Sequence, residues 1–416
     1  MENRGLIDPP GRNRNYILFT IAVFSCFAIL GVADNIRGTA LPRIQDEFSL
    51  TELHLGLLLT ANSVGYITAC TFTAALARRI GMKTCLVAGL SVIVLAGVCV
   101  CYSPGFAVLV LGFFILNVGF GMLDISAGII AARIFTKRTG MMMNIAHFFF
   151  GIGATMSPLI STGLMAARFG DFLLGWRYTY LLILSFALVP AIPTLLGHMK
   201  RQGGDGKQGG YSKLLKNPVL WLLTMVLAFE LVAESGAAAW LVNFLEKAHS
   251  YSGEKAALRL TLFFICFTAT RLTFGPLIDR FGLLRTIMVA PLLAGVMITV
   301  GVLAGEPGTP LLFLAGIGVA PMWPTVMAVI AKLFPDDLDR AMTVILTAIG
   351  VVVVPANLLM GGLINKARLI FTVAHGEAGV AMAYSAGYLF LGLCCFIAFA
   401  FAAILWARQK KAGIIV

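Results

Sequence analysis

The sequence predicts an all-α polytopic membrane protein, with twelve transmembrane helices in two pseudo-symmetric six-helix bundles. Three observations predict this class: the apolar composition, the number of long apolar runs, and a likeness between the two halves of the chain. Of 416 residues, 59% are hydrophobic and only 12% are charged, and the mean hydropathy is +0.92. Soluble domains carry about 25% charged residues. A water-soluble fold of this length could not cover so much apolar surface, so we expect the lipid bilayer to surround the protein.

Twelve apolar runs reach the ~20 residues that a membrane-spanning helix requires. They comprise residues 16–41, 53–77, 84–102, 106–133, 141–166, 178–199, 219–246, 257–278, 285–305, 310–332, 341–366 and 383–407. The first run is too long for the apolar part of a signal peptide and lacks a small-residue cleavage pattern, so we expect it to remain as the first span. Prolines inside several runs are compatible with spanning helices, because neighbouring helices can satisfy the freed backbone groups.

Lysine and arginine gather in alternate loops. With a cytoplasmic N-terminus, 21 of the 31 basic residues lie on the inner side and 8 on the outer side, while Arg37 and Arg271 fall within spans. This bias predicts a multi-pass protein of the plasma membrane, the inner membrane in a bacterium, with both termini cytoplasmic. Because the basic residues sit in these short loops, the net charge of +12 does not indicate nucleic-acid binding.

A glycine-rich, basic connection divides the chain into six spans and six spans. It covers residues 200–217, and we interpret it as a flexible cytoplasmic linker. Residues 1–199 are then the N-terminal six-helix bundle, and residues 218–416 are the C-terminal one.

The two halves resemble each other at corresponding spans. Glycines and prolines recur there at the same spacing: Gly153 with Pro158 and Gly350 with Pro355, and the pairs Gly119-x-Gly121 and Gly316-x-Gly318. Glycine pairs permit close helix contact, and proline kinks a helix. An internal repeat of this kind is the architecture of many secondary transporters.

Four of the nineteen acidic residues lie well inside spans: Asp34, Asp124, Glu230 and Glu234. A carboxylate at membrane depth costs at least ~2.5 kcal/mol, so it usually faces an aqueous cavity and marks a pathway. Low dielectric disfavours the charged form of a carboxylate, which allows such a group to load and release a proton. Asp124 has no basic residue nearby in the sequence and is the first candidate for the proton carrier. Asp34 and Glu234 are the further proton-coupling candidates.

A structural role for these acids is the alternative. Asp34 and Arg37 are three residues apart on one helix and could pair, which would make Asp34 an anchor or a gate. Arg271 and His147 are the other partners available within the spans.

Polar and aromatic side chains inside spans are candidates for contact with a solute. His147 shares a helical face with Asn144, and imidazole titrates near neutral pH. The alternative for His147 is a neutral ring that is hydrogen-bonded across helices. Trp240 and Trp323 could stack on a solute, although aromatic residues more often pack in the interior or anchor the membrane interface.

Enzymatic chemistry has little support in this sequence. The eight cysteines lie in or at the edge of apolar runs and have no zinc-ligand spacing. No Ser/His/Asp set, metal cluster or phosphate loop stands out, so we expect no enzyme activity, no metal and no cofactor. A sensor or scaffold without transport is disfavoured, since no loop is long enough to form a sizeable soluble domain.

The loop after span eight reads Gly275-Pro-Leu-Ile-Asp-Arg-Phe-Gly-Leu-Leu-Arg285. It resembles the G-x-L-x-D-R-x-G-x-x-R loop of the major facilitator superfamily, and the resemblance implies a gating role for its charged residues. The equivalent loop after span two departs from the pattern, with Arg78 where the aspartate is expected. The gating candidates are Arg37, Arg78, Arg271, Asp279, Arg280 and Arg285.

Within that superfamily the chain is similar to the fucose:proton symporter family over nearly its whole length. The similarity rests on residues 31–35, 41–42, 48–50, 65–66, 119–124, 144–153 and 320–324, together with Glu234 and Trp240. It implies a central cavity lined by spans one, four, seven and ten, with coupling carboxylates in spans one and four and sugar contacts from asparagine or glutamine. Asp124 matches the span-four acid, and Asn35 matches a span-one asparagine. The family's span-one aspartate falls on Gly38, and we expect Asp34, one turn away, to substitute for it.

These observations favour a secondary transporter that carries a sugar or similar small polar solute together with protons, by alternating access of its two halves. The candidate substrate-binding residues are Asn35, Asn144, His147, Glu230, Trp240 and Trp323. The alternative is a proton-driven exporter of amphiphilic or cationic compounds, because an acidic, aromatic cavity also suits cations. We expect a monomer whose partners are the small-molecule substrate, protons and lipid.

Overall fold

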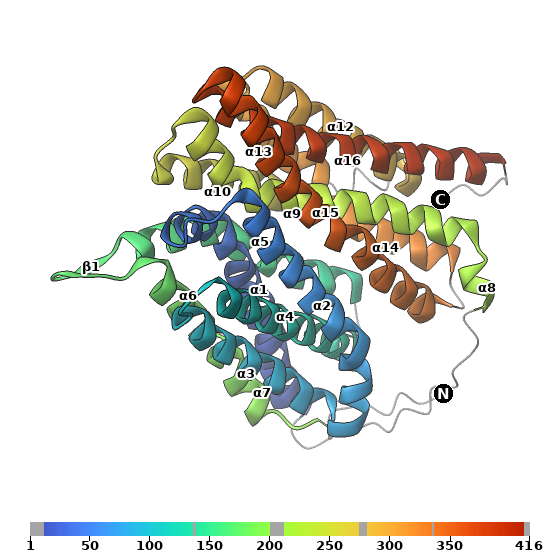
Figure 1. The fold of residues 1–416 in the computed structure, drawn as a ribbon. Coiled ribbons are helices and arrows are strands. Elements are labelled where there is room, and N and C mark those ends of the chain that lie inside the picture. Colours follow the sequence, from blue (N-terminus) through green and yellow to red (C-terminus); the bar gives the residue numbers. More distant parts are fainter. Residues whose placement is uncertain (1–11, 136–138, 200–211, 274–280, 335–336, 412–416) are drawn as a thin grey trace. The chain divides into compact units, whose positions relative to one another are not determined.

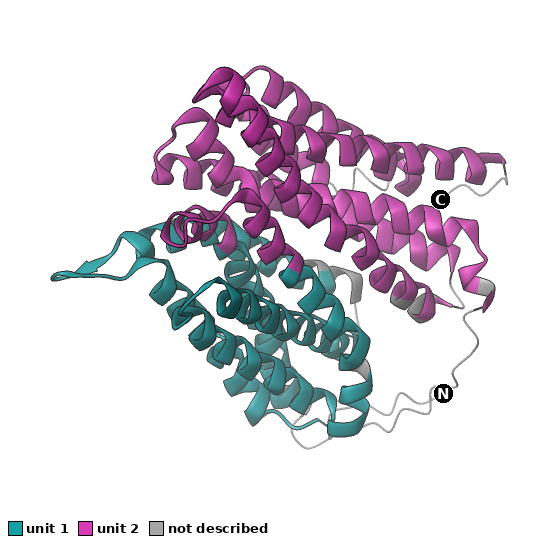
Figure 2. Cartoon of the chain, viewed as in Figure 1, with its two compact units in different colours: residues 1–36, 61–207 teal, residues 37–60, 208–416 magenta. Residues whose placement is uncertain are grey.

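The computed structural model describes residues 12–135, 139–199, 212–273, 281–334 and 337–411. Within them, twelve helical segments are long and apolar enough to cross a membrane, which confirms the predicted fold class (Figure 1). The chain divides into two compact units: residues 1–36 with 61–207, and residues 37–60 with 208–416 (Figure 2). The division passes through α1 (Arg12–Glu47) and α2 (Glu52–Ile80), so each of these helices contributes to both units.

The N-terminal unit contains the first part of α1, most of α2, and the elements that follow them. These are α3 (Met82–Cys101), α4 (Phe106–Ile134), α5 (Thr139–Ala166), β1 (Arg168–Phe169), β2 (Phe172–Leu173), α6 (Gly175–Ser185) and α7 (Leu188–Leu196). The two short strands form an antiparallel hairpin, and α3 packs along α4. Two consecutive short helices, α6 and α7, make up the sixth span.

The C-terminal unit contains the end of α1, the start of α2, and the second half of the chain. Its other elements are α8 (Ser212–Leu215), α9 (Pro218–His249), α10 (Gly253–Thr273), α12 (Leu283–Leu303), η1 (Glu306–Gly308), α13 (Thr309–Val319), α14 (Met322–Leu333), α15 (Leu338–His375) and α16 (Ala378–Lys411). Helix α16 packs along both α9 and α12. One aromatic contact in this core joins Phe244 of α9 to Tyr388 of α16, with ring centroids 4.5 Å apart.

The repeated glycine pairs mark close helix contacts in both units. Gly119 and Gly121 of α4 lie against Ile93 of α3 and Ala69 of α2, respectively. In the second half, Gly316 and Gly318 of α13 lie against Phe263 of α10 and Ala294 of α12. A β-carbon at any of these four positions would collide with its neighbour. The order of neighbours is reversed between the pairs, because the first glycine faces span three in one half and span eight in the other. The pairs therefore share a role but do not correspond residue for residue.

A more exact repeat occurs at the start of the third span of each half. Gly81 precedes α3 with φ 92° and ψ 148°, and Gly282 precedes α12 with φ 85° and ψ 144°. Side chains other than hydrogen rarely tolerate this backbone conformation. The same turn thus re-enters the bundle in both halves, which explains the glycine in each of the two loops.

Spans six and ten are broken helices, and in span ten side chains bond the carbonyls at the break. In span ten, between α13 and α14, the Ala320 carbonyl accepts a hydrogen bond from Arg271 Nε at 3.1 Å. The Pro321 carbonyl accepts one from the Thr325 hydroxyl at 2.6 Å. Irregular backbone at membrane depth requires such internal partners. By contrast, α5 and α15 continue through Pro158 and Pro355 without interruption.

Candidate functional site

The N-terminal unit holds one carboxylate bound by a phenol. Asp124, half-buried on α4, accepts a hydrogen bond at its Oδ2 from the Tyr66 hydroxyl of α2 at 2.6 Å. This distance is typical of the short, strong bond that a hydroxyl donates to a carboxylate. The sequence analysis assigned Asp124 a role in coupling, whereas Tyr66 entered only through the family resemblance and was given no role in the site.

Glycines explain how Tyr66 reaches Asp124. Gly65, next to Tyr66, lies directly against the Phe114 carbonyl of α4, and Gly121, three residues before Asp124, lies against the Tyr66 carbonyl of α2. Neither position could carry a side chain without separating the two helices. The close approach of the α2 and α4 backbones places the phenol within hydrogen-bonding distance of the carboxylate. The signal available in the sequence was the glycine beside the tyrosine.

Asp34 belongs to the same electrostatic site. It lies half-buried on α1 and interacts electrostatically with both Asp124 and Tyr66. The structure therefore brings together the two acids that the sequence assigned to spans one and four. The neighbouring Asn35 is 5% exposed, and its side-chain amide donates to the Gly31 carbonyl of its own helix at 2.9 Å.

His147 packs between helices of the N-terminal unit. Its half-buried ring contacts Phe27 of α1 edge-on, with centroids 5.1 Å apart. This contact places the imidazole at the junction of α1 and α5. Asn144 lies one turn earlier on α5, and its side chain is outside the described part of the structure.

The C-terminal unit holds a different arrangement, in which two acids share one arginine. Glu230 and Glu234 lie one turn apart on α9 and interact electrostatically with each other and with Arg271 of α10. Glu230 is 0% exposed, and within the described residues neither of its carboxylate oxygens meets a hydrogen-bond donor. The Arg271 guanidinium also stacks on the Phe267 ring, 4.1 Å from its centroid, while its Nε binds the broken helix at Ala320.

The two tryptophans have different surroundings. Trp240 of α9 is fully enclosed, with 0% exposure, so neither face of its indole is open in this structure. Trp323 is half-buried in the first turn of α14, directly after the helix break that Arg271 binds. Trp323 therefore has the more accessible ring of the two candidates.

The gating candidates lie in several separate places. Arg37 is half-buried on the part of α1 that belongs to the C-terminal unit. Arg78 is exposed in the last turn of α2, and Arg285 is exposed in the first turn of α12. Asp279 and Arg280 are outside the described residues.

A basic residue in the loop after span two has a defined structural role that the sequence did not indicate. Lys83, two residues after Gly81, donates hydrogen bonds from Nζ to the carbonyls of Leu195 at 2.8 Å and Gly197 at 2.7 Å. These carbonyls lie at the C-terminal end of α7, where a positive charge also complements the helix dipole. The loop thus ties the end of span six to the start of span three.

Comparison of the sequence with protein families gives a consistent result. The model of the Major Facilitator Superfamily matches residues 23–258 and 231–414. Among individual proteins, the L-fucose-proton symporter of Escherichia coli strain K12 is 22% identical over 377 residues, covering 82% of this chain and 86% of the symporter.

Solved structures support the same fold. The fucose transporter FucP in its outward conformation matches with a TM-score of 0.65 at 20% identity, covering 94% of this chain and 99% of FucP. A bacterial homologue of the human lysosomal transporter Spinster matches at 0.78 with 15% identity, covering 96% and 98%. A D-xylose-proton symporter matches at 0.75 with 13% identity, covering 94% and 97%. Because the family model spans nearly the whole chain, this protein belongs to the Major Facilitator Superfamily of membrane transporters and is not an enzyme.

Proposed function

We propose that this transporter moves a sugar or a similar small polar solute together with protons, and that Asp124 carries the coupled proton. The observation that carries the proposal is the 2.6 Å hydrogen bond from Tyr66 to Asp124, with Asp34 close enough to interact with both. A carboxylate in a membrane span is costly and is usually retained for a function.

The chemistry of this pair suits reversible protonation. The charged carboxylate accepts the phenol proton, whereas a protonated carboxyl can itself donate to the phenol oxygen. Tyr66 can therefore remain bonded in both states while the charge at Asp124 changes. No arginine or lysine is among the groups that interact with Asp124 in the described residues, so no fixed cation holds it permanently charged.

The nature of the solute is proposed from the relatives. Two proteins with which the chain shares sequence or fold are named as proton symporters of sugars, one for L-fucose and one for D-xylose. At 22% identity or less, they support the solute class rather than a particular sugar. Within that class we assign solute contact to the side chains proposed above: Asn35, Asn144, His147, Glu230, Trp240 and Trp323. Glu230 and Trp240 are enclosed in this structure, so their contact with solute requires another state of the transport cycle.

The remaining assignments follow from charge and position. We propose that Asp34 and Glu234 assist proton coupling and that Arg37, Arg78, Arg271, Asp279, Arg280 and Arg285 act in gating. The distribution of basic residues supports an orientation with both termini cytoplasmic in a plasma or bacterial inner membrane. Protease accessibility of the two termini in sealed vesicles would test that orientation.

Solute-driven proton uptake into proteoliposomes tests the coupling. We expect Asp124→Asn to abolish driven uptake and to retain counterflow, because exchange of solute needs no net proton movement. The matched control is Asp171→Asn, which removes an exposed aspartate of the β1–β2 turn. If Asp124→Asn leaves driven uptake intact, Asp124 is not the proton carrier.

A thermal-shift screen of the purified protein tests the solute class. Stabilisation by one or a few sugars supports symport of a sugar. Stabilisation by lipophilic cations together with no response to any sugar would instead favour the proton-driven exporter.

A further inference from the structure

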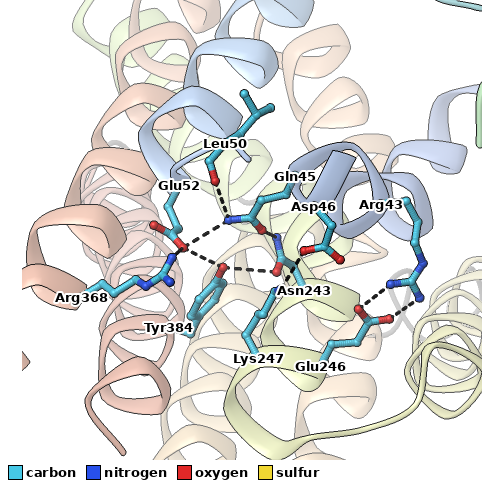
Figure 3. A network of polar contacts seen from close by, with 10 residues as sticks. All are labelled: Arg43, Gln45, Asp46, Leu50, Glu52, Asn243, Glu246, Lys247, Arg368 and Tyr384. Carbon is cyan, nitrogen blue, oxygen red and sulfur yellow. Dashed lines mark hydrogen bonds and ion pairs between the residues drawn. The ribbon is translucent and has the colours of Figure 1, made fainter. Parts of the chain in front are cut away.

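The connection between α1 and α2 is part of the C-terminal unit, although most of both helices is not. Residues 37–60 comprise the last turns of α1, a short link and the first turns of α2, and they group with residues 208–416. Figure 3 shows this segment beside α9, α15 and α16, with polar side chains from each of them pointing toward it.

Glu52 is the centre of this contact. Its side chain is 1% exposed, and its Oε1 accepts hydrogen bonds from three elements (Figure 3). The donors are Arg368 Nη1 of α15 at 2.7 Å, the Tyr384 hydroxyl of α16 at 3.2 Å and Gln45 Nε2 of α1 at 3.2 Å. Asn243 of α9 completes the group by donating to Gln45 Oε1 at 2.9 Å. We call these five residues, Gln45, Glu52, Asn243, Arg368 and Tyr384, the clasp.

The clasp is incompletely satisfied. The second carboxylate oxygen of Glu52, Oε2, is buried and meets no hydrogen-bond donor among the described residues. The Tyr384 hydroxyl has one proton but lies 3.2 Å from two acceptors, Glu52 Oε1 and Asn243 Oδ1, so it can satisfy only one at a time. The strongest single bond in the group is the 2.7 Å ion pair of Glu52 and Arg368. An unsatisfied buried acceptor carries a desolvation penalty, which is relieved when the segment opens and water reaches it.

The outer ion pairs of the segment are of a different kind. Arg43 binds Glu246 through two hydrogen bonds at 2.9 and 2.7 Å, and Lys247 binds Asp46 at 3.0 Å. The cations of all three pairs are accessible to water: Arg43 is 39% exposed, Lys247 35% and Arg368 46%. The acids differ, because Glu52 is 1% exposed, whereas Glu246 is 12% and Asp46 57% exposed. Water and salt weaken the Lys247–Asp46 pair most, since both of its side chains are accessible.

The backbone packing beneath the clasp also permits separation. Gly56 of α2 lies directly against Gly361 of α15, and Gly38 of α1 lies against Ala238 of α9. Small residues allow the helices to approach without interlocking long side chains. In a membrane protein, apolar contacts alone give little preference for helix contact over lipid contact. The polar bonds of the clasp are therefore the main specific attachment.

We propose that the clasp is a releasable latch: the ion pair of buried Glu52 with the accessible Arg368, with Tyr384 as a second donor, holds residues 37–60 on the C-terminal bundle in one part of the transport cycle and releases them in the other. The proposal rests on transport by alternating access, which requires helix contacts that form and break. It does not depend on the solute or on proton coupling.

Thiol labelling of the purified protein tests the latch without any transported solute. The reporter is Leu260→Cys, because Leu260 of α10 is 0% exposed and its side chain packs on Gly38. A maleimide should modify this thiol only when the segment lifts away. Its rate is measured by peptide mass spectrometry, above the background of the eight native cysteines.

We expect Glu52→Gln to accelerate labelling of Leu260→Cys by about tenfold, because it removes the charge from a hydrogen-bonded ion pair. Arg368→Gln should accelerate it at least as much, since it leaves the buried carboxylate without a counter-charge. The matched control, Lys247→Gln, removes an outer pair and should change the rate less than twofold.

A second reporter separates release of the latch from loss of the fold. Ile298→Cys lies 1% exposed on α12, packed against Gly392 of α16 and away from the clasp. Its labelling should stay slow in every variant. Unchanged labelling of Leu260→Cys in both Glu52→Gln and Arg368→Gln would overturn the proposal. An equal acceleration at both reporters would also overturn it, because the network would then support the fold as a whole.

Discussion

The two units of this transporter differ in the groups that interact with the carboxylates inside their spans. In the N-terminal unit, Asp124 is bound by the neutral hydroxyl of Tyr66. In the C-terminal unit, Glu230 and Glu234 interact with the positive charge of Arg271. A neutral hydroxyl can bond a carboxylate in both its charged and its protonated form. A nearby arginine instead stabilises the charged form of a carboxylate.

Arg271 also bonds the backbone of another span, whereas the Tyr66 hydroxyl bonds a side chain. Its Nε binds the Ala320 carbonyl at the break in span ten, so the same side chain supports the backbone and balances the acids. Charge in the C-terminal unit is thus tied to helix geometry, whereas our proposal has the charge of Asp124 in the N-terminal unit change during transport.

Arg271→Met should be the most destabilising change. It removes the positive charge that interacts with two acids on α9 and also removes a partner from the helix break, and we expect a loss of about 2–4 kcal/mol. The measurement is the free energy of unfolding in mixed micelles. Arg259→Met, in the same helix, is the control and should cost less than about 1 kcal/mol. Recovery of stability in the triple variant with Glu230→Gln and Glu234→Gln would identify charge balance as the cause, whereas no recovery would point to the Ala320 bond.

Tyr66→Phe should impair coupling more than folding. The lost hydrogen bond to a charged group is worth about 1.5–3 kcal/mol, so solute-driven proton uptake should fall by about tenfold or more. Tyr388→Phe is a matched control, because its hydroxyl donates to the Ala237 carbonyl at 2.9 Å and touches no acid in the described residues. That variant should lose stability and keep its ratio of protons to solute. Equal coupling ratios in the two variants would remove Tyr66 from the proton site.

The turn glycines allow a direct comparison of the two halves. Gly81→Ala and Gly282→Ala should each cost on the order of 1–3 kcal/mol, since both positions have a backbone conformation that alanine rarely adopts. The free energy of unfolding measures each loss. Because φ and ψ nearly coincide at the two sites, we expect losses of similar size. A large loss at one site alone would mean that the loops have diverged in their structural role.

Hydropathy predicted the number of spans because lipid imposes a minimum apolar length. It predicted helix ends less well, since a helix can continue beyond the hydrocarbon. The first span, expected over 16–41, belongs to a helix that continues through Pro42 to Glu47. The eleventh, expected over 341–366, continues to His375. The polar turns beyond these limits contain Gln45 and Arg368 of the clasp, as well as Arg43 of the outer ion pair with Glu246.

Only the charged residues of the site were predictable from the sequence. Asp34 and Asp124 stood out because carboxylates are rare in apolar runs. Tyr66 did not, since a tyrosine in a span is ordinary until a close contact of α2 with α4 places it beside an acid. Glu52 lies in the first turn of α2, where acidic residues are common, and the packing of α15 and α16 buries it. Contacts between distant segments decide these roles, and no local pattern encodes them.

Lys83→Met should have the smallest of these effects and should sharpen the comparison of the two loops. Lys83 binds two carbonyls at the end of α7, but it is partly solvated, so we expect a loss of about 0.5–1 kcal/mol in the free energy of unfolding. Arg285, in the first turn of α12, is exposed, and Arg285→Met should change stability by less than about 0.5 kcal/mol. If the two losses are equal, the basic residue serves both loops alike. If only Lys83→Met matters, the N-terminal loop, which departs from the family pattern, has kept its basic residue to close span six onto span three.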